Sequence, residues 1–170
     1  MKRERLTGTD LLKAVLEKFN YRSETGKFLY KKAWGPKRVG DVAGHNHKGY
    51  RMLCLKDNNY YIHILVYLVE NGFEAPDQID HRDHNRSNNH ISNLRACSCS
   101  ENRGNVDLRK DNTSGYRGVY SNKRDQNWKA QITVNGKVIH LGSFTDILEA
   151  AATYEAAALK HFGKFYFKAS

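Results

Sequence analysis

The 170-residue sequence has few of the residues that mark secreted, disordered or membrane proteins. Its three cysteines are an odd number and too few for the disulfide framework of a small secreted domain. Only two prolines, together with 11% aromatic residues, argue against wholesale disorder. No apolar run approaches the ~20 residues of a membrane helix, and no apolar segment follows the basic start at residues 1–6. The default expectation is therefore a soluble cytoplasmic protein with no membrane partner and no secretory signal.

Acidic residues are also scarce relative to basic ones. The chain has 28 Lys and Arg residues against 18 Asp and Glu, a formal net charge of +10. This balance favours a polyanionic partner, nucleic acid above all, although a merely soluble basic protein has the same charge. The length suits one domain or two small ones.

Turn residues divide the first part of the chain into short elements. Apolar residues at helical spacing predict a helix over residues 10–19, and turn signals then bound several short strands. The most apolar run, 60–69, stops at Asn71-Gly72, and its length favours a buried helix over a strand. We interpret His63 on this helix as a packing residue.

The last part of the chain, after a polar linker at 107–113, has the pattern of a sheet followed by one helix. Residues 128–134 alternate strictly and end at Asn135-Gly136, the strongest short hairpin signal, so residues 137–144 are the partner strand. An Ala-rich helix then extends to about residue 162 and stops at a glycine. Its face of small residues would let it lie close on a sheet.

The residues best suited to chemistry lie within 79–103. Asp80 supplies an anionic oxygen and Asn102 a carbonyl oxygen, and two such ligands suit Mg²⁺ or Mn²⁺, which bind through few protein groups. His81 titrates near neutrality and is the natural base for deprotonating a water. Phosphodiester hydrolysis needs both parts, a cation on the phosphate and an activated water. Four nearby arginines are candidates for contacts to DNA phosphates: Arg82, Arg86, Arg95 and Arg103.

This segment resembles the HNH (ββα-metal) nuclease family, in particular its homing-endonuclease branch from phages and introns. The resemblance covers about residues 21–105. It implies that Asp80 and Asn102 are metal ligands, that His81 is the general base, and that Asn93 bridges the loop by hydrogen bonds so that His81 is aimed correctly. The matching stretches are Ile79-Asp80-His81, Ile91-Ser92-Asn93-Leu94-Arg95 and Ser100-Glu101-Asn102.

The sequence departs from the family in the loop and in the cysteines. Asn102 stands where His is usual, which favours an oxygen-loving cation over zinc, and His84 stands where glycine is common. Some members hold a structural zinc in two Cys-x-x-Cys pairs. Here Cys97 and Cys99 have the wrong spacing and Cys54 stands alone, so we expect no structural zinc. We interpret the three cysteines as small buried hydrophobes.

The C-terminal stretch resembles the plant ethylene-response-factor (APETALA-type) DNA-binding domain. The resemblance implies a three-stranded antiparallel sheet backed by one helix, with the sheet in the major groove of DNA. By strand alternation, Ile139 and Leu141 are expected to face inward. The blocks that match, in order, are 114–119, 128–132, 141–144 and 150–154. The candidate DNA contacts are Arg117, Tyr120, Asn122, Lys129, Gln131, Thr133 and His140.

A basic segment near the N-terminus is a weaker candidate for DNA contact. Lys31 and Lys32 lie close to Trp34, and positive charge around one aromatic side chain could follow a phosphate backbone. An ordinary solvated strand pair explains the same pattern equally well.

Together these features predict an α+β protein with an HNH nuclease domain at 1–106, whose ββα-metal core spans about 78–106, a linker at 107–113 and an ethylene-response-factor-like domain at 114–170. The predicted function is a site-specific, metal-dependent homing endonuclease of a mobile element that cuts double-stranded DNA in a bacterial or phage-infected cell. We favour a monomer and expect no small-molecule cofactor. Two alternatives stay open: a DNA-binding regulator in which the HNH fold has lost activity, and a zinc-stapled structural adaptor.

Overall fold

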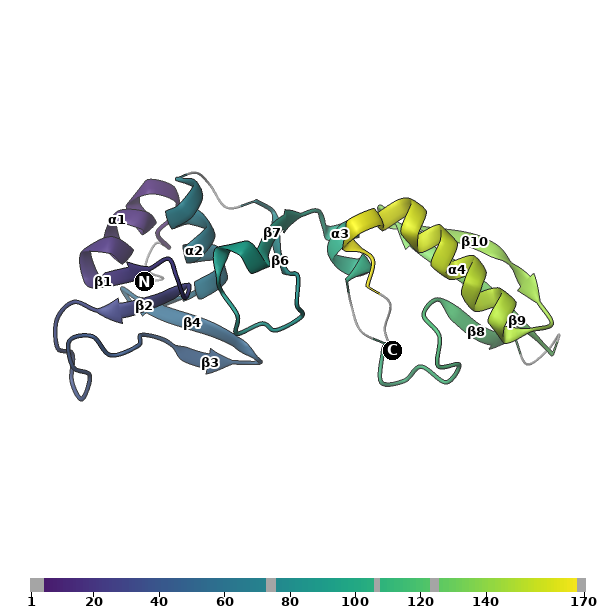
Figure 1. Cartoon of the computed structure of the whole chain (residues 1–170), viewed down its shortest axis with the longest axis horizontal. Coiled ribbons are helices and arrows are strands. Elements are labelled where there is room, and N and C mark those ends of the chain that lie inside the picture. The colour runs from purple at the N-terminus through teal and green to yellow at the C-terminus, as the bar shows by residue number, and fades with distance from the viewer. Residues whose placement is uncertain (1–4, 73–75, 106–107, 123–125, 168–170) are drawn as a thin grey trace. The chain divides into compact units, whose positions relative to one another are not determined.

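The chain forms two compact units, Met1–Ala96 and Cys97–Ser170, and each is described by itself (Figure 1). The computed structural model describes residues 5–72, 76–105, 108–122 and 126–167, and of Asn122 only the backbone. Within these ranges, no helix has the length and apolar character needed to cross a membrane. The division assigns residues 97–105 to the second unit, whereas the sequence predicts a domain boundary at 106. The predicted domain limits stay predictions.

The first unit combines helices with three small sheets. Its helices are α1 (Gly8–Lys18), α2 (Ile62–Asn71) and the short 3₁₀ helix η1 (Ile91–Asn93). Its strands pair as β1 (Phe19–Arg22) with β2 (Lys27–Tyr30), as β3 (His45–His47), β4 (Tyr50–Leu55) and β5 (Asn58–Tyr61) in that order, and as β6 (Gln78–His81) with β7 (Leu94–Cys97).

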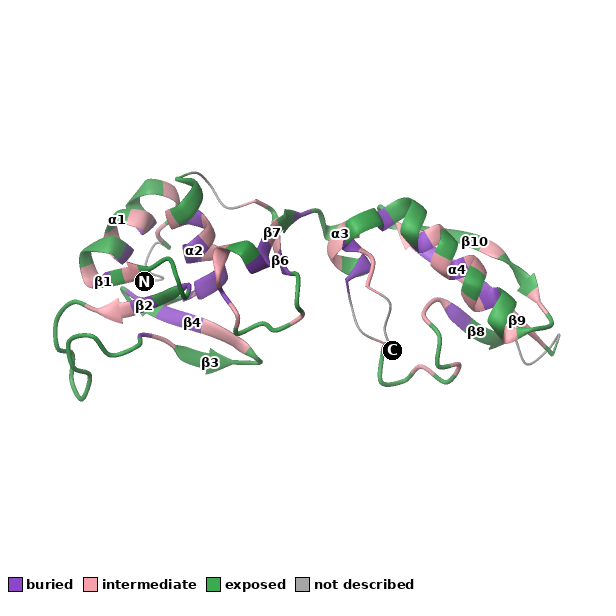
Figure 2. Cartoon of the chain, in the orientation of Figure 1, coloured by how far each residue is buried: buried purple, intermediate pink, exposed green. Residues whose placement is uncertain are grey.

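One apolar core joins these elements. Leu11 and Val15 of α1 are buried, as their helical spacing predicts, and they belong to the same cluster as Phe19 and Phe28 of the β1–β2 hairpin. Leu16 of the same helix is 37% exposed, so the apolar face of α1 is narrower than the sequence suggests. Figure 2 shows further buried residues on α2 and β4.

Helix α2 begins later than the apolar run 60–69 predicts. Tyr60 and Tyr61 instead pair with Leu53 and Met52 as the end of β5, so their backbone groups bond to a neighbouring strand. The helix ends at Gly72, whose left-handed conformation (φ 65°) is the usual C-terminal stop. His63 is buried on this helix, which agrees with a packing role.

The second unit has a sheet with the strand order β10-β9-β8, all antiparallel. The β9–β10 turn has positive φ at Asn135 (50°) and Gly136 (78°), the type I′ geometry that an Asn-Gly pair predicts. The elements of this unit are α3 (Cys99–Gly104), β8 (Val119–Asn122), β9 (Asn127–Val134), β10 (Lys137–Phe144), α4 (Ile147–Phe162) and the 3₁₀ helix η2 (Gly163–Phe165).

Helix α4 packs closely on this sheet through its small residues. Ala150 and Ala158 are fully buried in one cluster with Ala130 and Ile132 of β9, as the Ala-rich face predicts. A shift in register between His140 and Gly142 alters the alternation along β10. Leu141 packs against this core, and Ile139 is the direct partner of the buried Ile132 on the inner face, as predicted, although it is still 37% exposed.

Helix α3 also packs within the second unit. A Cβ atom at Gly104 would lie 2.8 Å from Cγ of Phe162, so only glycine allows α3 to approach α4 this closely. Ser98 and Glu101 form a reciprocal capping box at the start of α3, which satisfies backbone groups at this end.

Candidate active site

Three of the four predicted catalytic and metal-binding residues gather around β6 and β7 in the first unit. Asp80 and His81 are the last residues of β6 and are only 6% and 5% exposed. Asn93, also buried, lies in η1, and its carbonyl oxygen accepts a hydrogen bond from Arg82 N at 2.9 Å, beside His81. Asn102 lies on α3 and belongs to the second unit.

The His81 ring is fixed by a side chain eight residues further along. Its Nε2 lies 3.1 Å from Oδ1 of Asn89. The amide nitrogen of Asn89 donates to the carbonyl oxygen of Ser87, so Oδ1 is the atom that faces the histidine. An oxygen accepts here, so Nε2 carries the proton and Nδ1 carries the lone pair. The loop thus selects the tautomer whose basic atom is Nδ1.

Asn93 ties the two ends of the 82–93 loop together. Its Nδ2 donates to Oδ1 of Asp83 at 2.8 Å and to the carbonyl oxygen of Asn88 at 2.9 Å. Its Oδ1 accepts from the backbone N–H of Asp83 at 3.1 Å. One buried amide therefore satisfies polar groups from both sides of the loop, which is the bridging geometry that the sequence predicts for this residue.

Asp83 and His84 explain the conformation of the same loop. Burial raises the pKa of the Asp83 carboxyl, but hydrogen bonds from Asn88, Asn93 and the Asn85 backbone outweigh it and lower the pKa. The carboxylate therefore stays ionised as a hub of the loop. His84 has φ 61°, a left-handed conformation that costs glycine least, which accounts for the family's preference at this position.

Asp80 is held by an arginine. Nε and Nη2 of Arg95, on the adjacent β7, lie 2.8 and 2.7 Å from Oδ2 of Asp80. The two side chains are 9% and 7% exposed, so removing either partner would leave a buried charge uncompensated, at a cost of ~3–5 kcal/mol. Arg95 therefore serves Asp80, in place of the phosphate contact predicted for it.

Aromatic rings surround the other side of His81. The ring of His63 meets it edge-on with a centroid distance of 5.1 Å, and Tyr50 lies 6.1 Å away. Tyr61 stacks on His63 at 5.3 Å, and the Arg86 guanidinium lies 5.0 Å from the Tyr50 centroid. Burial, with the charge of His81, lowers the pKa of His63 to about 4, so this histidine is neutral near pH 7.

The environment of His81 keeps it neutral as well. Burial lowers its pKa below the ordinary 6.5, and the positive charge of Arg86 acts in the same direction. The Asn89 hydrogen bond and the Asp80 and Asp83 charges oppose this shift without cancelling it. At pH 7 the imidazole is therefore an available base.

Comparisons with known proteins identify the family. The HNH endonuclease family profile matches residues 60–103, which include Asp80, His81, Asn93 and Asn102. Protein 3.8 of Escherichia phage T7 is 36% identical over 91 residues, which cover 53% of this chain and 74% of that protein. The chain belongs to the HNH endonuclease family. An uncharacterized HNH endonuclease of Acanthamoeba polyphaga mimivirus is 30% identical over 106 residues, 61% of this chain and about half (54%) of that relative. No solved structure matches significantly.

Sequence reasoning missed several residues that shape this HNH site. In the sequence alone, Asn89 looks like one more turn residue, and Arg95 looks like a residue that contacts DNA phosphates. In the structure, Asn89 bonds to His81 and Arg95 pairs with Asp80. The Tyr50 ring lies near the His81 ring, and Gly26 lies against the backbone of Asn89. These two residues are 31 and 55 positions before His81 in the sequence, so no local pattern links them to it. Only for Arg95 did the sequence offer a signal. If the strand that contains Arg95 is assumed to pair with the strand of Asp80, side-chain alternation can place the two residues side by side.

The DNA contacts predicted for the second unit of this HNH protein fall into three cases. Arg117 is engaged internally: its guanidinium donates to the carbonyl oxygens of Arg103, Gly104 and Phe167 at 2.8–3.2 Å, which favours a structural role. For Asn122 the structure describes the backbone but not the side chain, so its DNA contact stays a prediction. The others lie on β8, β9 and β10 with half-buried or exposed side chains, and their DNA contacts stay predictions: Tyr120, Lys129, Gln131, Thr133 and His140.

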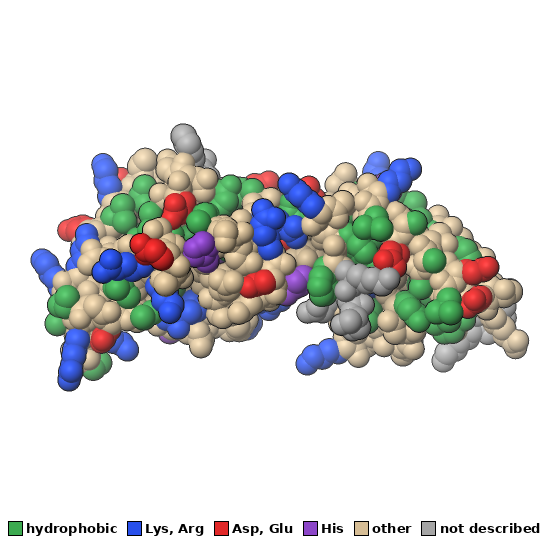
Figure 3. Space-filling model, in the orientation of Figure 1, with side chains coloured by type: hydrophobic (Ala, Val, Ile, Leu, Met, Phe, Trp, Pro, Cys, Tyr) green, Lys and Arg blue, Asp and Glu red, His purple; other side chains and the backbone are tan. Residues whose placement is uncertain are grey.

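Among the remaining basic candidates for DNA contact, one side chain is bonded within the protein and two are exposed. The Lys31 ammonium donates to the carbonyl oxygen of Leu16 near the end of α1, where a cation stabilises the helix terminus. Lys32 and Arg103 are exposed. Figure 3 shows lysine and arginine side chains spread over the visible face of the first unit, with fewer acidic ones among them.

The cysteines only partly fit the prediction of small buried hydrophobes. Cys97 is buried in the core of the second unit, but Cys54 and Cys99 are exposed, which contradicts the prediction for these two. Across the ranges that the structure describes, no three His, Cys, Asp or Glu side chains gather as a metal site.

Proposed function

We propose that this HNH protein is a site-specific, divalent-metal-dependent DNA endonuclease of the homing type, which hydrolyses a phosphodiester bond with His81 as general base. One observation carries the proposal: buried His81, whose Nε2 is held by Asn89, directly follows Asp80 in β6, and the charge of Asp80 favours the protonated ring. Membership of the HNH family supports a nucleic acid as substrate.

In this mechanism, His81 Nδ1 takes a proton from the attacking water. The imidazolium that forms is stabilised by the carboxylates of Asp80 and Asp83, whose charges favour the protonated ring. The bond from Nε2–H to Asn89 becomes charge-assisted and therefore stronger at the same moment. The loop pinned by Asn93 holds these groups in place before the reaction, so little reorganisation is needed.

HNH nucleases generally use divalent metals, and Asp80 is the residue of the first unit that would hold one here. A carboxylate and an amide oxygen suit Mg²⁺ or Mn²⁺, which bind through few protein groups. When bound, such an ion supplies positive charge to the phosphate and the departing oxygen. Arg95 fixes the orientation of the Asp80 carboxylate. Asn102 stays a predicted ligand from the second unit.

Plasmid cleavage by the full chain tests this proposal. We expect cleavage with Mg²⁺ or Mn²⁺, none with EDTA, and weaker Mg²⁺ activation in Asp80→Ala, partly rescued by Mn²⁺ because oxygen ligands suit both ions. Asp10→Ala, which removes an exposed carboxylate from α1, is the control and should cleave like the wild type. Cleavage that survives EDTA would contradict metal dependence. DNA binding without any cleavage would favour the inactive regulator.

Gly26 provides a test of the loop that aims His81. This buried turn glycine has φ 62°, and a Cβ atom added to it would lie 2.2 Å from the carbonyl oxygen of Asn89. Gly26→Ala should therefore push Asn89 away from His81, lower the free energy of unfolding by ~1–3 kcal/mol, and slow single-turnover cleavage ~10- to 100-fold. Denaturant unfolding and cleavage rates measure the two effects.

Gly72→Ala is the matched control for Gly26→Ala. Its φ of 65° imposes the same backbone strain, but no heavy atom of the described residues beyond its chain neighbours lies within 4 Å of the added Cβ. It should lose stability with an unchanged cleavage rate. Equal rates in the two variants would show that the Gly26 contact does not position the site.

A further inference from the structure

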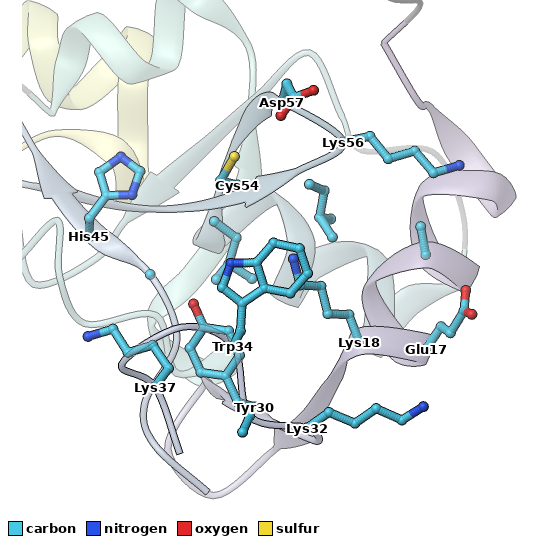
Figure 4. Close-up of a pocket in the computed structure, with 15 residues that line it drawn as sticks. Glu17, Lys18, Tyr30, Lys32, Trp34, Lys37, His45, Cys54, Lys56 and Asp57 are labelled. Carbon is cyan, nitrogen blue, oxygen red and sulfur yellow. The ribbon is translucent and has the colours of Figure 1, made fainter. Parts of the chain in front are cut away.

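A second depression lies on the first unit, apart from the His81 site. Its volume is about 820 Å³, within the range that holds a nucleotide-sized ligand. Side chains from α1, from the segment after β2 and from β4 with the turn that follows it line the depression, and Asp80, His81, Asn89 and Asn93 are not among them. Figure 4 shows the Trp34 indole in the middle of this pocket.

Trp34 is displayed on a tight, well-bonded turn. Its backbone N–H and carbonyl oxygen both pair with Lys37 at 3.0 Å, and the turn between them contains Gly35 and Pro36, which hold the chain in a fixed bend. The residue is nevertheless 64% exposed. Single exposed apolar side chains are common on protein surfaces, but tryptophan is enriched at interfaces, so an exposed indole beside a depression is a candidate contact for a partner.

The charge around Trp34 is positive. The Lys18 ammonium lies 4.1 Å from the centroid of the indole, a cation–π contact, and much of the ring still remains open. Lys32, Lys37 and Lys56 are exposed at the rim, against the two carboxylates of Glu17 and Asp57. The floor includes apolar side chains such as Leu53 and Leu55. An aromatic face beside several ammonium groups complements a base with its phosphate.

We propose that this pocket binds one unstacked nucleotide of the DNA substrate, with its base against Trp34 and the phosphates of the strand on either side of it near Lys32, Lys37 and Lys56. The inference rests on the proposed function for the nature of the strand. A free nucleotide offers the same chemistry, but a strand is favoured because the lysines stand on several sides of the pocket and can follow a backbone. The pocket would hold DNA at a second point, away from the scissile phosphate.

The test measures binding of the full chain to labelled DNA, in EDTA and at one salt concentration. The ligands are a single strand, a duplex with one unpaired base, the fully paired duplex, and the mononucleotide dTMP as competitor. Trp34→Leu should weaken binding of the first two ~5- to 150-fold, the value of one base–aromatic stack, and of the paired duplex less than twofold. Trp34→Phe keeps a ring and should restore most of the loss.

Charge variants provide the matched comparison. Lys37→Ala should reduce the salt dependence of binding by about one counterion. Lys13→Ala, which removes an exposed lysine of α1 that does not line the pocket, should bind unpaired DNA like the wild type. Unchanged binding in Trp34→Leu would overturn the inference, as would dTMP competing at the affinity of the oligonucleotide, since the site would then serve a free nucleotide.

Plasmid cleavage run in parallel separates this inference from the proposed function. A chain that cuts DNA but binds unpaired bases independently of Trp34 refutes only the pocket. A chain that never cuts DNA, yet loses binding with Trp34→Leu, refutes the endonuclease and supports the pocket.

Discussion

Replacing His81 with alanine is expected to slow single-turnover DNA cleavage ~10²–10⁴-fold, the usual contribution of a general base, with DNA affinity nearly unchanged. The reason is that His81 is buried, is held as the Nδ1-basic tautomer by Asn89, and stands beside the predicted metal ligand Asp80. Cleavage rates at saturating metal and protein, with DNA binding in EDTA, measure the two quantities. His47→Ala removes an exposed histidine of β3 and should leave both unchanged.

The pH profile makes the same test sharper. Only the neutral imidazole accepts a proton, so the wild-type rate should rise with pH through the pKa of His81 and level off above it. Burial lowers that pKa below 6.5, and a cation on neighbouring Asp80 would lower it further, so the midpoint should fall below pH 6.5. His81→Ala should lose this rise. A variant that kept the wild-type rate and profile would remove His81 from the mechanism.

Loss of site preference is the second large effect, expected on replacing Gln131, Thr133 and His140 together with alanine. These side chains lie on the β9–β10 hairpin, where Gln131 and His140 are direct cross-strand partners. α4 packs against the buried Ala130 and Ile132, which alternate with Gln131 and Thr133 along β9, so the three predicted contacts lie on the other face. Each base contact is worth ~1–3 kcal/mol, so the loss of three should lower discrimination between target and scrambled duplexes ~10²–10⁶-fold.

The measurement begins with a run-off cleavage map on a pool of duplexes to find the preferred site. The preference for target over scrambled DNA is then measured separately for the triple variant and for the wild type. Both measurements use one salt concentration, because the phosphate contribution to binding falls steeply with salt. Lys160→Ala with His161→Ala changes exposed residues of α4 and should keep the preference. Equal discrimination in all three proteins would place the specificity in the first unit.

The packing of α3 requires that these experiments use the full chain. The sequence places a linker at 107–113 and suggests that residues 1–106 can be made alone. In the structure, Cys97 is buried in the core of the second unit, and Gly104 lies against Phe162. A fragment ending at 106 would strip α3, with Asn102, of these contacts. Its loss of activity would then report on folding as well as on targeting.

Much of the site was predictable because its signals are local. Asp80 and His81 are adjacent, and Asn93 and Asn102 follow at the spacing of the HNH pattern, so the residues on which the proposed mechanism depends could be predicted from the chain alone. The Asn135-Gly136 turn and the apolar spacing of α1 are equally local, since each depends on the backbone preferences of a few neighbouring residues.

Other features depend on pairing between distant segments. The Arg95–Asp80 ion pair exists because β7 lies beside β6, and the register shift between His140 and Gly142 interrupts an alternation that strand periodicity alone predicts. The sequence suggests that Arg117 contacts DNA. In the fold, however, its guanidinium donates to the carbonyl oxygens of Gly104 and Phe167, which lie far from it in the sequence.

The sequence by itself therefore determined the HNH family and the basic character, and it singled out His81, Asp80 and Asn93 as candidates, because these are properties of composition and of short spacings. Only the tertiary structure decided which nitrogen of His81 is basic and that its pKa is low. Both follow from Asn89 and from burial beside Tyr50 and other rings, brought to the site from elsewhere in the chain. The orientation of the His81 ring and its removal from water depend on segments that are distant in the sequence, so no local pattern predicts them.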